Sequence, residues 1–180
     1  MSMTPRASLI VVLVLASAAL VGCASGGGVP RPQPFPGAVV PPASAGKAGE
    51  SPAAAAASSI IETALSLRGT PYANGGSDPS RGFDCSGFVQ WVFARHGSVL
   101  PREVREQFDR GRRINTDDVQ PGDLVFFETV SRGPSHVGIA LGGGEFVHAP
   151  SSRGVVRVER YTSGYWSTRW VGARRVVLAE

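Results

Sequence analysis

The chain has 180 residues, of which 42% are hydrophobic, so it has room for one folded domain and a tail. Its formal net charge of +4 is mild and is spread along the chain. The short basic groups at 110–113 and 173–175 are typical of solvated faces rather than of a nucleic-acid site. We therefore expect no nucleic-acid partner, and we expect a monomer.

Residues 1–22 have the pattern of a secretory signal peptide, in which Arg6 precedes the apolar run ASLIVVLVLASAALVG. This run is about 16 residues long, fewer than the ~20 that span a membrane comfortably. Its end, LVGC, resembles a bacterial lipobox. The resemblance implies cleavage between Gly22 and Cys23 and acylation of Cys23. An ordinary signal peptide or an uncleaved anchor are the alternatives.

Residues 23–57 have the composition of a tether. From residue 24 onward they hold 7 of the 14 prolines, with glycine, alanine and serine and almost no large apolar residue. Such a segment cannot bury enough surface to offset its ordering entropy, and its proline-rich part is expected to be semi-extended. An acylated Cys23 would attach it to a lipid bilayer, and we expect the periplasmic face of the outer membrane in the cell envelope.

The folded domain is predicted to cover residues 58–180. Ser59 and Glu62 have the spacing of a capping box at its first helix. Apolar periodicity predicts helices over 59–68, 85–96 and 103–110. Strands are predicted at 123–129, 136–142, 145–149, 155–160 and 174–180. Helices followed by strands indicate an α+β fold with an antiparallel sheet.

One cysteine stands at the start of the second predicted helix. Asp84 is placed to cap this helix, so Cys85 falls in its first turn. The free N–H groups of a helix N-terminus carry partial positive charge, which stabilises a thiolate and a developing oxyanion. We therefore expect the pKa of Cys85 to lie below the ~8.5 of a free cysteine. A buried, inert cysteine is the alternative.

A cysteine nucleophile needs a base, and the chain contains 3 histidines. His96 lies at the far end of the same predicted helix, too distant to touch Cys85. His136 and His148 fall in consecutive predicted strands, so with Cys85 they suggest a nucleophile, a base and an orienting residue. These three side chains could instead bind zinc, although the chain lacks a His-x-x-x-His or Cys-x-x-Cys pair.

The two histidine strands are expected to form a hairpin through residues 142–144, where glycine tolerates the positive φ of a tight turn. With a three-residue loop, Leu141 pairs with Glu145, and His136 and His148 become diagonal neighbours on one face. A two-residue loop would shift the register by one residue and place the histidines on opposite faces.

Four stretches resemble the NlpC/P60 cysteine peptidases of bacterial cell walls, namely GTPYANGG, FDCSGFVQWVF, PGDLVFF and SHVGIALGGGEFVHAP. Within that family, LPREVREQ and YWSTRWVGARRV are most similar to the lipoprotein murein endopeptidases. The match covers roughly Ile60 to Leu178. The resemblance implies a papain-like α+β fold with circularly permuted topology.

The resemblance also implies roles for single residues. Cys85 would be the nucleophile, His136 the general base and acid, and His148 the residue that orients the base. The reaction would hydrolyse an amide bond of a peptidoglycan stem peptide or cross-bridge through a thioester acyl-enzyme. It would require no metal and no cofactor.

Other matching residues surround the nucleophile. Tyr72 would lie near the oxyanion, and Asp84 and Ser86 would contact the substrate peptide, although a helix cap and a small spacer are their simpler roles. Arg102 matches a family position whose role the sequence does not assign. Both the D-alanyl–diaminopimelate and the γ-D-glutamyl–diaminopimelate bond are open, and the subtype resemblance favours the first. A permuted-papain acyltransferase or amidase and a non-enzymatic wall-binding lipoprotein are the alternative functions.

Overall fold

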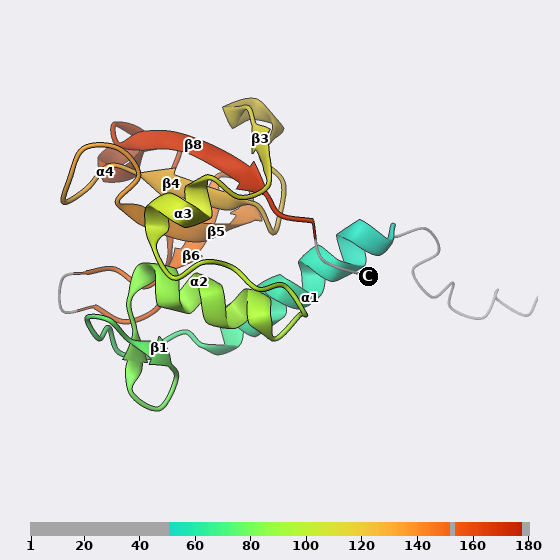
Figure 1. The fold of residues 1–180 in the computed structure, drawn as a ribbon. Coiled ribbons are helices and arrows are strands. Elements are labelled where there is room, and N and C mark those ends of the chain that lie inside the picture. The colour runs from blue at the N-terminus through green and yellow to red at the C-terminus, as the bar shows by residue number, and fades with distance from the viewer. Residues whose placement is uncertain (1–50, 152–153, 178–180) are drawn as a thin grey trace, which may run out of the picture. The chain divides into compact units, whose positions relative to one another are not determined.

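The computed structural model describes residues 51–151 and 154–177 (Figure 1). The larger helices come first and a six-stranded antiparallel sheet follows, which confirms the predicted α+β fold. The expected signal peptide, Cys23 and most of the expected tether lie outside the described residues. Within the described part, no helix combines the length and the apolar character that crossing a bilayer requires.

The first helix, α1, spans Pro52–Ser66 and begins earlier than predicted. Its N-cap is Ser51, whose hydroxyl accepts a backbone N–H of the first turn at 3.2 Å. The interpretation of Ser59 and Glu62 as a capping box is therefore wrong, because the alanine run before them is itself a strong helix former. The helix thus includes the last residues of the expected tether. It buries Ile60 in the hydrophobic core that it shares with the sheet.

The second helix, α2, spans Cys85–Ala94 and carries the cysteine at its first position, as predicted. Asp84 is its N-cap: Oδ1 of Asp84 accepts the N–H of Gly87 at 2.7 Å. Three short elements surround it in the chain: β1 (Ser77–Asp78), β2 (Gly82–Phe83) and α3 (Val104–Phe108). The antiparallel pairing of β1 with β2 folds the preceding loop into a hairpin directly in front of the helix.

The main sheet has the strand order β3-β8-β4-β5-β6-β7, and every pair in it is antiparallel. Its strands are β3 (Arg112–Ile114), β4 (Leu124–Phe127), β5 (His136–Gly142), β6 (Glu145–His148), β7 (Arg157–Arg160) and β8 (Trp170–Arg175). A 3₁₀ turn, η1 (Thr116–Asp118), follows β3, and a short helix, α4 (Gly164–Ser167), precedes β8.

One strand prediction is wrong, because the last strand ends at Arg175 instead of running from 174 to 180. The basic segment at 110–113 is exposed, as predicted, but its second half also belongs to edge strand β3, which the sequence analysis did not predict. This strand exposes two arginines but buries Ile114, and it pairs with β8. A three-residue strand is too short to show a period of two, which is why the sequence pattern did not reveal it.

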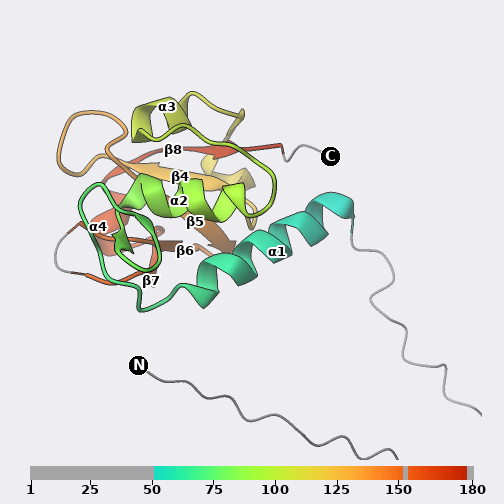
Figure 2. The ribbon, with the colours of Figure 1, turned by 60° about the horizontal axis from the view of Figure 1, so that its bottom comes forward.

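Side chains alternate along each strand, so the sheet has two buried faces. One face packs against α1 and α2 and contains Val137 and Ile139; Figure 2 shows α2 in front of β4 and β5. The other face contains Phe127 and Phe146, and Trp166 of α4 packs against it. Residues of β5 that are next to each other in sequence therefore lie in different environments.

The β5–β6 hairpin differs from its prediction in the turn and agrees with it in the outcome. Ile139 pairs with Val147, as expected, but Gly142 rather than Leu141 pairs with Glu145. The loop is therefore two residues long, and both of its glycines have positive φ (+59° and +80°). A register shift between Ala140 and Gly142 absorbs the extra residue, so the register at the histidines is the predicted one.

Candidate active site

Cys85 is partly buried at the tip of α2 and packs at the edge of the helix-side core. The backbone N–H of Val137 forms a hydrogen bond with its sulfur, as do the N–H groups of Ser86 and of Cys85 itself. Because Val137 follows His136, the thiol lies beside the beginning of β5. The tip of α2 is thus brought to the end of the strand that carries the first histidine.

The expected low pKa of this thiol is wrong for the protein without substrate. Burial, and next the charge of Asp84, raise the pKa of Cys85 to about 11. The backbone N–H groups of Val137 and Ser86 oppose this shift but do not outweigh it. The thiol is therefore protonated at neutral pH until something removes its proton.

His136 and His148 lie on one face of the sheet, as predicted. Nε2 of His136 and Nδ1 of His148 are 2.8 Å apart, a hydrogen-bond distance, and both side chains are buried. Burial lowers the pKa of each histidine to about 3; the neighbouring His148 adds to the shift at His136, and Arg157 adds to it at His148. Both rings are therefore neutral at physiological pH.

Aromatic side chains fix the orientation of both imidazoles. The ring of Trp166 stacks on His136 with centroids 5.0 Å apart, and the ring of Phe146 stacks on His148 at 4.5 Å. Trp166 also meets His148 edge-on at 4.9 Å. These contacts belong to the face of the sheet opposite to α2. Cys85 lies on the helix side, beside Val137, the residue that follows His136 at the start of β5.

A residue that the sequence analysis did not select completes the histidine chain. Oε2 of Glu159 in β7 lies 3.1 Å from Nε2 of His148 and also accepts the indole N–H of Trp166. Oε1 of Glu159 lies 2.8 Å from the guanidinium of Arg157. The register of β7 with β6 places Glu159 opposite Phe146, on the histidine face. Extending the hairpin argument by one strand would have found it.

A second polar group lies on the other side of the cysteine. Arg102 forms an ion pair with Oδ2 of Asp84 and donates to the hydroxyl of Ser86 at 2.7 Å. Burial raises the pKa of Tyr72, and the charges of Cys85 and Asp84 add to this effect while Arg102 opposes it. The structure thus brings Tyr72, Asp84 and Ser86 close to the cysteine, and it gives Arg102 a clear role in holding two of them.

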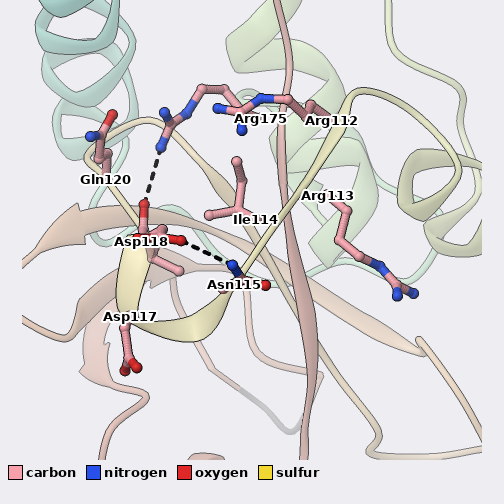
Figure 3. A pocket seen from close by; sticks show the side chains of 9 residues that line it. Arg112, Arg113, Ile114, Asn115, Asp117, Asp118, Gln120 and Arg175 are labelled. Carbon is pink, nitrogen blue, oxygen red and sulfur yellow. Dashed lines mark hydrogen bonds between the residues drawn. The ribbon is translucent and has the colours of Figure 1, made fainter.

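Two surface cavities lie elsewhere, and none of the three predicted catalytic residues lines either of them. The first, of about 390 Å³, is lined by β3, η1 and Arg175 (Figure 3). Its polar groups bind one another: Asn115 donates to the carboxylate of Asp118 at 3.0 Å, and Arg175 donates to the backbone carbonyl of Asp118 at 3.3 Å. The second, of about 550 Å³, lies between 99–101 and α3. We assign the chemistry to the cysteine and histidine site instead.

The zinc alternative finds no support in the geometry. Among residues 51–151 and 154–177, no cluster of three or more histidine, cysteine, aspartate or glutamate side chains is arranged to hold a metal ion. The facing nitrogens of His136 and His148 point at each other rather than at a common centre.

The sequence and the fold both match known proteins. The NlpC/P60 family model matches residues 69–175. The murein DD-endopeptidase MepS/murein LD-carboxypeptidase of Escherichia coli (strain K12) is 40% identical over 121 residues, 67% of this chain and 63% of the relative. The gamma-DL-glutamyl hydrolase of Bacillus subtilis (strain 168) is 37% identical over 120 residues, 65% of this chain and 29% of the relative. The chain spans less than two thirds of the length of these relatives.

A solved structure agrees with these relatives. A protein described as similar to lipoprotein, NLP/P60 family, from Staphylococcus aureus subsp. aureus Mu50 has a TM-score of 0.62 at 37% identity. The match covers 69% of this chain and 42% of that one. Since the family model matches more than half of the chain, from the residues before Tyr72 through the last strand, the chain belongs to the NlpC/P60 family.

Proposed function

We propose that the protein is a cysteine peptidase that hydrolyses an amide bond of peptidoglycan. The observation that carries this proposal is the arrangement of Cys85 at a helix tip beside β5, where a hydrogen-bonded chain of two buried histidines, His136 and His148, and Glu159 begins. A helix N-terminus next to a neutral histidine supplies a nucleophile, a base and donors for an oxyanion. The family relatives named as murein endopeptidases support the same substrate class.

The proposed reaction follows from the protonation states. The resting thiol and imidazole are both neutral, so His136 takes the Sγ proton as the sulfur attacks the substrate carbonyl. A C–S bond forms, and the carbonyl oxygen becomes an oxyanion near the N–H groups at the start of α2 and the hydroxyl of Tyr72. The C–N bond then breaks, and His136 returns its proton to the leaving amine. Water, deprotonated by His136, hydrolyses the thioester and releases the thiol.

The polar group around Arg102 is the proposed substrate-binding side of the site. Asp84 and Ser86 flank the nucleophile in the chain, and Arg102 holds both side chains in place. They offer a carboxylate and a hydroxyl to the stem peptide, as the family resemblance implies. The two relatives have names that refer to different bonds, and the masses of the muropeptide products distinguish the D-alanyl–diaminopimelate from the γ-D-glutamyl–diaminopimelate bond.

Digestion of defined muropeptides, with products weighed by mass spectrometry, tests the proposal. The wild type should release one stem-peptide fragment, and Cys85→Ala should release none. Tyr165→Phe is a matched control, since Tyr165 is exposed and its ring stacks with Arg169. Cleavage that persists in Cys85→Ala, or a wild type that cleaves no muropeptide, contradicts the proposal.

We also propose that an acylated Cys23 attaches the protein to a membrane of the cell envelope. The lipobox-like LVGC and the tether-like composition after it support this. Cys23→Ser should move the protein from the membrane fraction to the soluble fraction while activity on soluble muropeptides stays unchanged. Continued presence of the variant in the membrane fraction would refute lipid attachment through Cys23.

A further inference from the structure

Glu159 lies at the far end of the hydrogen-bond chain that starts at His136. We propose that Glu159 is a positioning residue: its carboxylate sets the tautomers of both histidines so that Nδ1 of His136 carries no proton and is free to accept the one on Cys85. This inference rests on the proposed function, in which His136 is the base.

The first step of the argument is the carboxylate itself. Its two oxygens receive donors from Arg157 at 2.8 Å and from the indole N–H of Trp166, which can only donate. A carboxylate that accepts from two donors has no hydrogen of its own to donate. The nitrogen that faces it at 3.1 Å, Nε2 of His148, must therefore carry a hydrogen.

The second step concerns the hydrogen bond between the two histidines, because the tautomer of His148 determines that of His136. Burial keeps both histidines neutral, so each ring has a single N–H. If Nε2 of His148 carries it, Nδ1 of His148 has a lone pair and accepts. Nε2 of His136, 2.8 Å away, must then be the donor. Nδ1 of His136 is the remaining nitrogen, and it has the lone pair that a base requires.

The third step concerns the charge that appears when His136 takes the proton. The resulting imidazolium lies in a buried site from which the side chain of His148 excludes water, since His148 has no exposed surface. The negative charge of Glu159 favours the protonated form of His136 across the intervening ring. Glu159 therefore acts through His148, without contacting the substrate and without taking up the proton.

If Glu159 had only a structural role, its substitution would not change the histidine tautomers. Glu159 could serve only to join β7 to α4 through Arg157 and Trp166. Substitution by glutamine keeps the size, but its single amide oxygen can replace only one of the two carboxylate oxygens. With that oxygen toward Arg157, the contact to Arg157 is kept and the NH₂ takes the place of Oε2, which faces Trp166 and His148. What glutamine changes is the group that faces His148, since its NH₂ can donate to Nε2 and reverse both tautomers.

The test reads the tautomers directly. In the full-length protein labelled with ¹⁵N at histidine, long-range ¹H–¹⁵N correlations report which ring nitrogen carries the hydrogen. Both His136 and His148 should show the Nε2–H form. Glu159→Gln should shift both toward Nδ1–H and should lower kcat about 100-fold or more with KM little changed, as expected for a wrongly oriented base.

Two variants control this experiment. Glu145→Gln changes a half-exposed carboxylate on the neighbouring strand, which pairs with Arg160 at 3.6 Å, and should alter neither the tautomers nor kcat. Glu159→Asp keeps an acceptor-only carboxylate and should retain the Nε2–H forms. It also tests the proposal if the glutamine variant does not fold.

Each outcome decides between the hypotheses. An Nδ1–H form of His148 in the wild type, or tautomers and kcat that do not change in Glu159→Gln, overturns the positioning role. The tautomer measurement needs no substrate. A protein that shows the predicted tautomers and their reversal but cleaves no muropeptide therefore supports the hydrogen-bond assignment and overturns the proposed function.

Discussion

The pKa of Cys85 leads to a prediction whose size can be worked out. Burial raises this pKa from 9.0 to about 11, so at pH 8 the thiolate fraction should be about 100-fold smaller than that of an ordinary cysteine. A thiolate of higher pKa is intrinsically more nucleophilic, and a Brønsted coefficient of ~0.5 recovers about tenfold over two pKa units. We therefore expect alkylation at pH 8 to be roughly 10-fold slower than for an unfolded chain, before any loss of access.

The assay follows iodoacetamide labelling by mass spectrometry in a Cys23→Ser chain, where Cys85 is the only thiol. The labelling rate should rise through a midpoint well above pH 9, and the same chain in urea should show the ordinary midpoint. Asp84→Asn should move the midpoint of the folded protein down, because it removes the second cause of the shift while asparagine still caps the helix. A rate that is already maximal at neutral pH would indicate a thiolate–imidazolium pair and would refute the neutral resting state.

Three further predictions concern the surroundings of the site. Gly138→Ala should lower the free energy of unfolding in urea by about 1–3 kcal/mol and reduce kcat, because its Cβ would come 2.6 Å from the ring of Phe146, 2.8 Å from the carbonyl oxygen of Val147 and 3.0 Å from Cβ of His148. Gly143→Asn, in an open turn at φ +59°, should change neither the stability nor kcat. Arg102→Ala should lower kcat/KM about tenfold through the loss of charge-assisted hydrogen bonds, and an unchanged value would contradict its role. Burial lowers the pKa of His136 and of His148 to about 3, so both stay neutral in the folded state while they protonate in the unfolded chain below pH ~6.5. The free energy of unfolding should therefore fall as the pH drops from 6.5 toward 3, and it should fall less steeply in His136→Phe. An equal slope in that variant would contradict this account.

The sequence predicted the features that depend on short-range patterns. Asp84 before an apolar helix predicted both the cap and the position of Cys85, because capping is a contact across three residues. The alternation of side chains along a strand, taken with a three-residue turn, predicted that His136 and His148 share a face, and their rings are within hydrogen-bond distance.

The features that the sequence did not predict depend on contacts between distant segments. The pKa of Cys85 is set by how deeply the tip of α2 is buried against β5, and no local pattern contains this burial. Glu159 is one of several charged residues in an exposed-looking strand, and only the register of β7 with β6 shows that it faces the histidines. The two-residue turn would have reversed the histidine prediction, and only the register shift before Gly142 preserves it.

A thiol that keeps its proton until substrate arrives has a consequence for the lifetime of the enzyme. Peroxides and disulfides react with thiolates and only slowly with thiols, so the sulfenic, sulfinic and sulfonic acid ladder begins at the deprotonated form. For the exported peptidase proposed above, burial of Cys85 would thus slow oxidative inactivation in a compartment that the cytoplasmic reductants do not reach. The packing that lowers the reactivity of the resting thiol would therefore also protect it from irreversible oxidation.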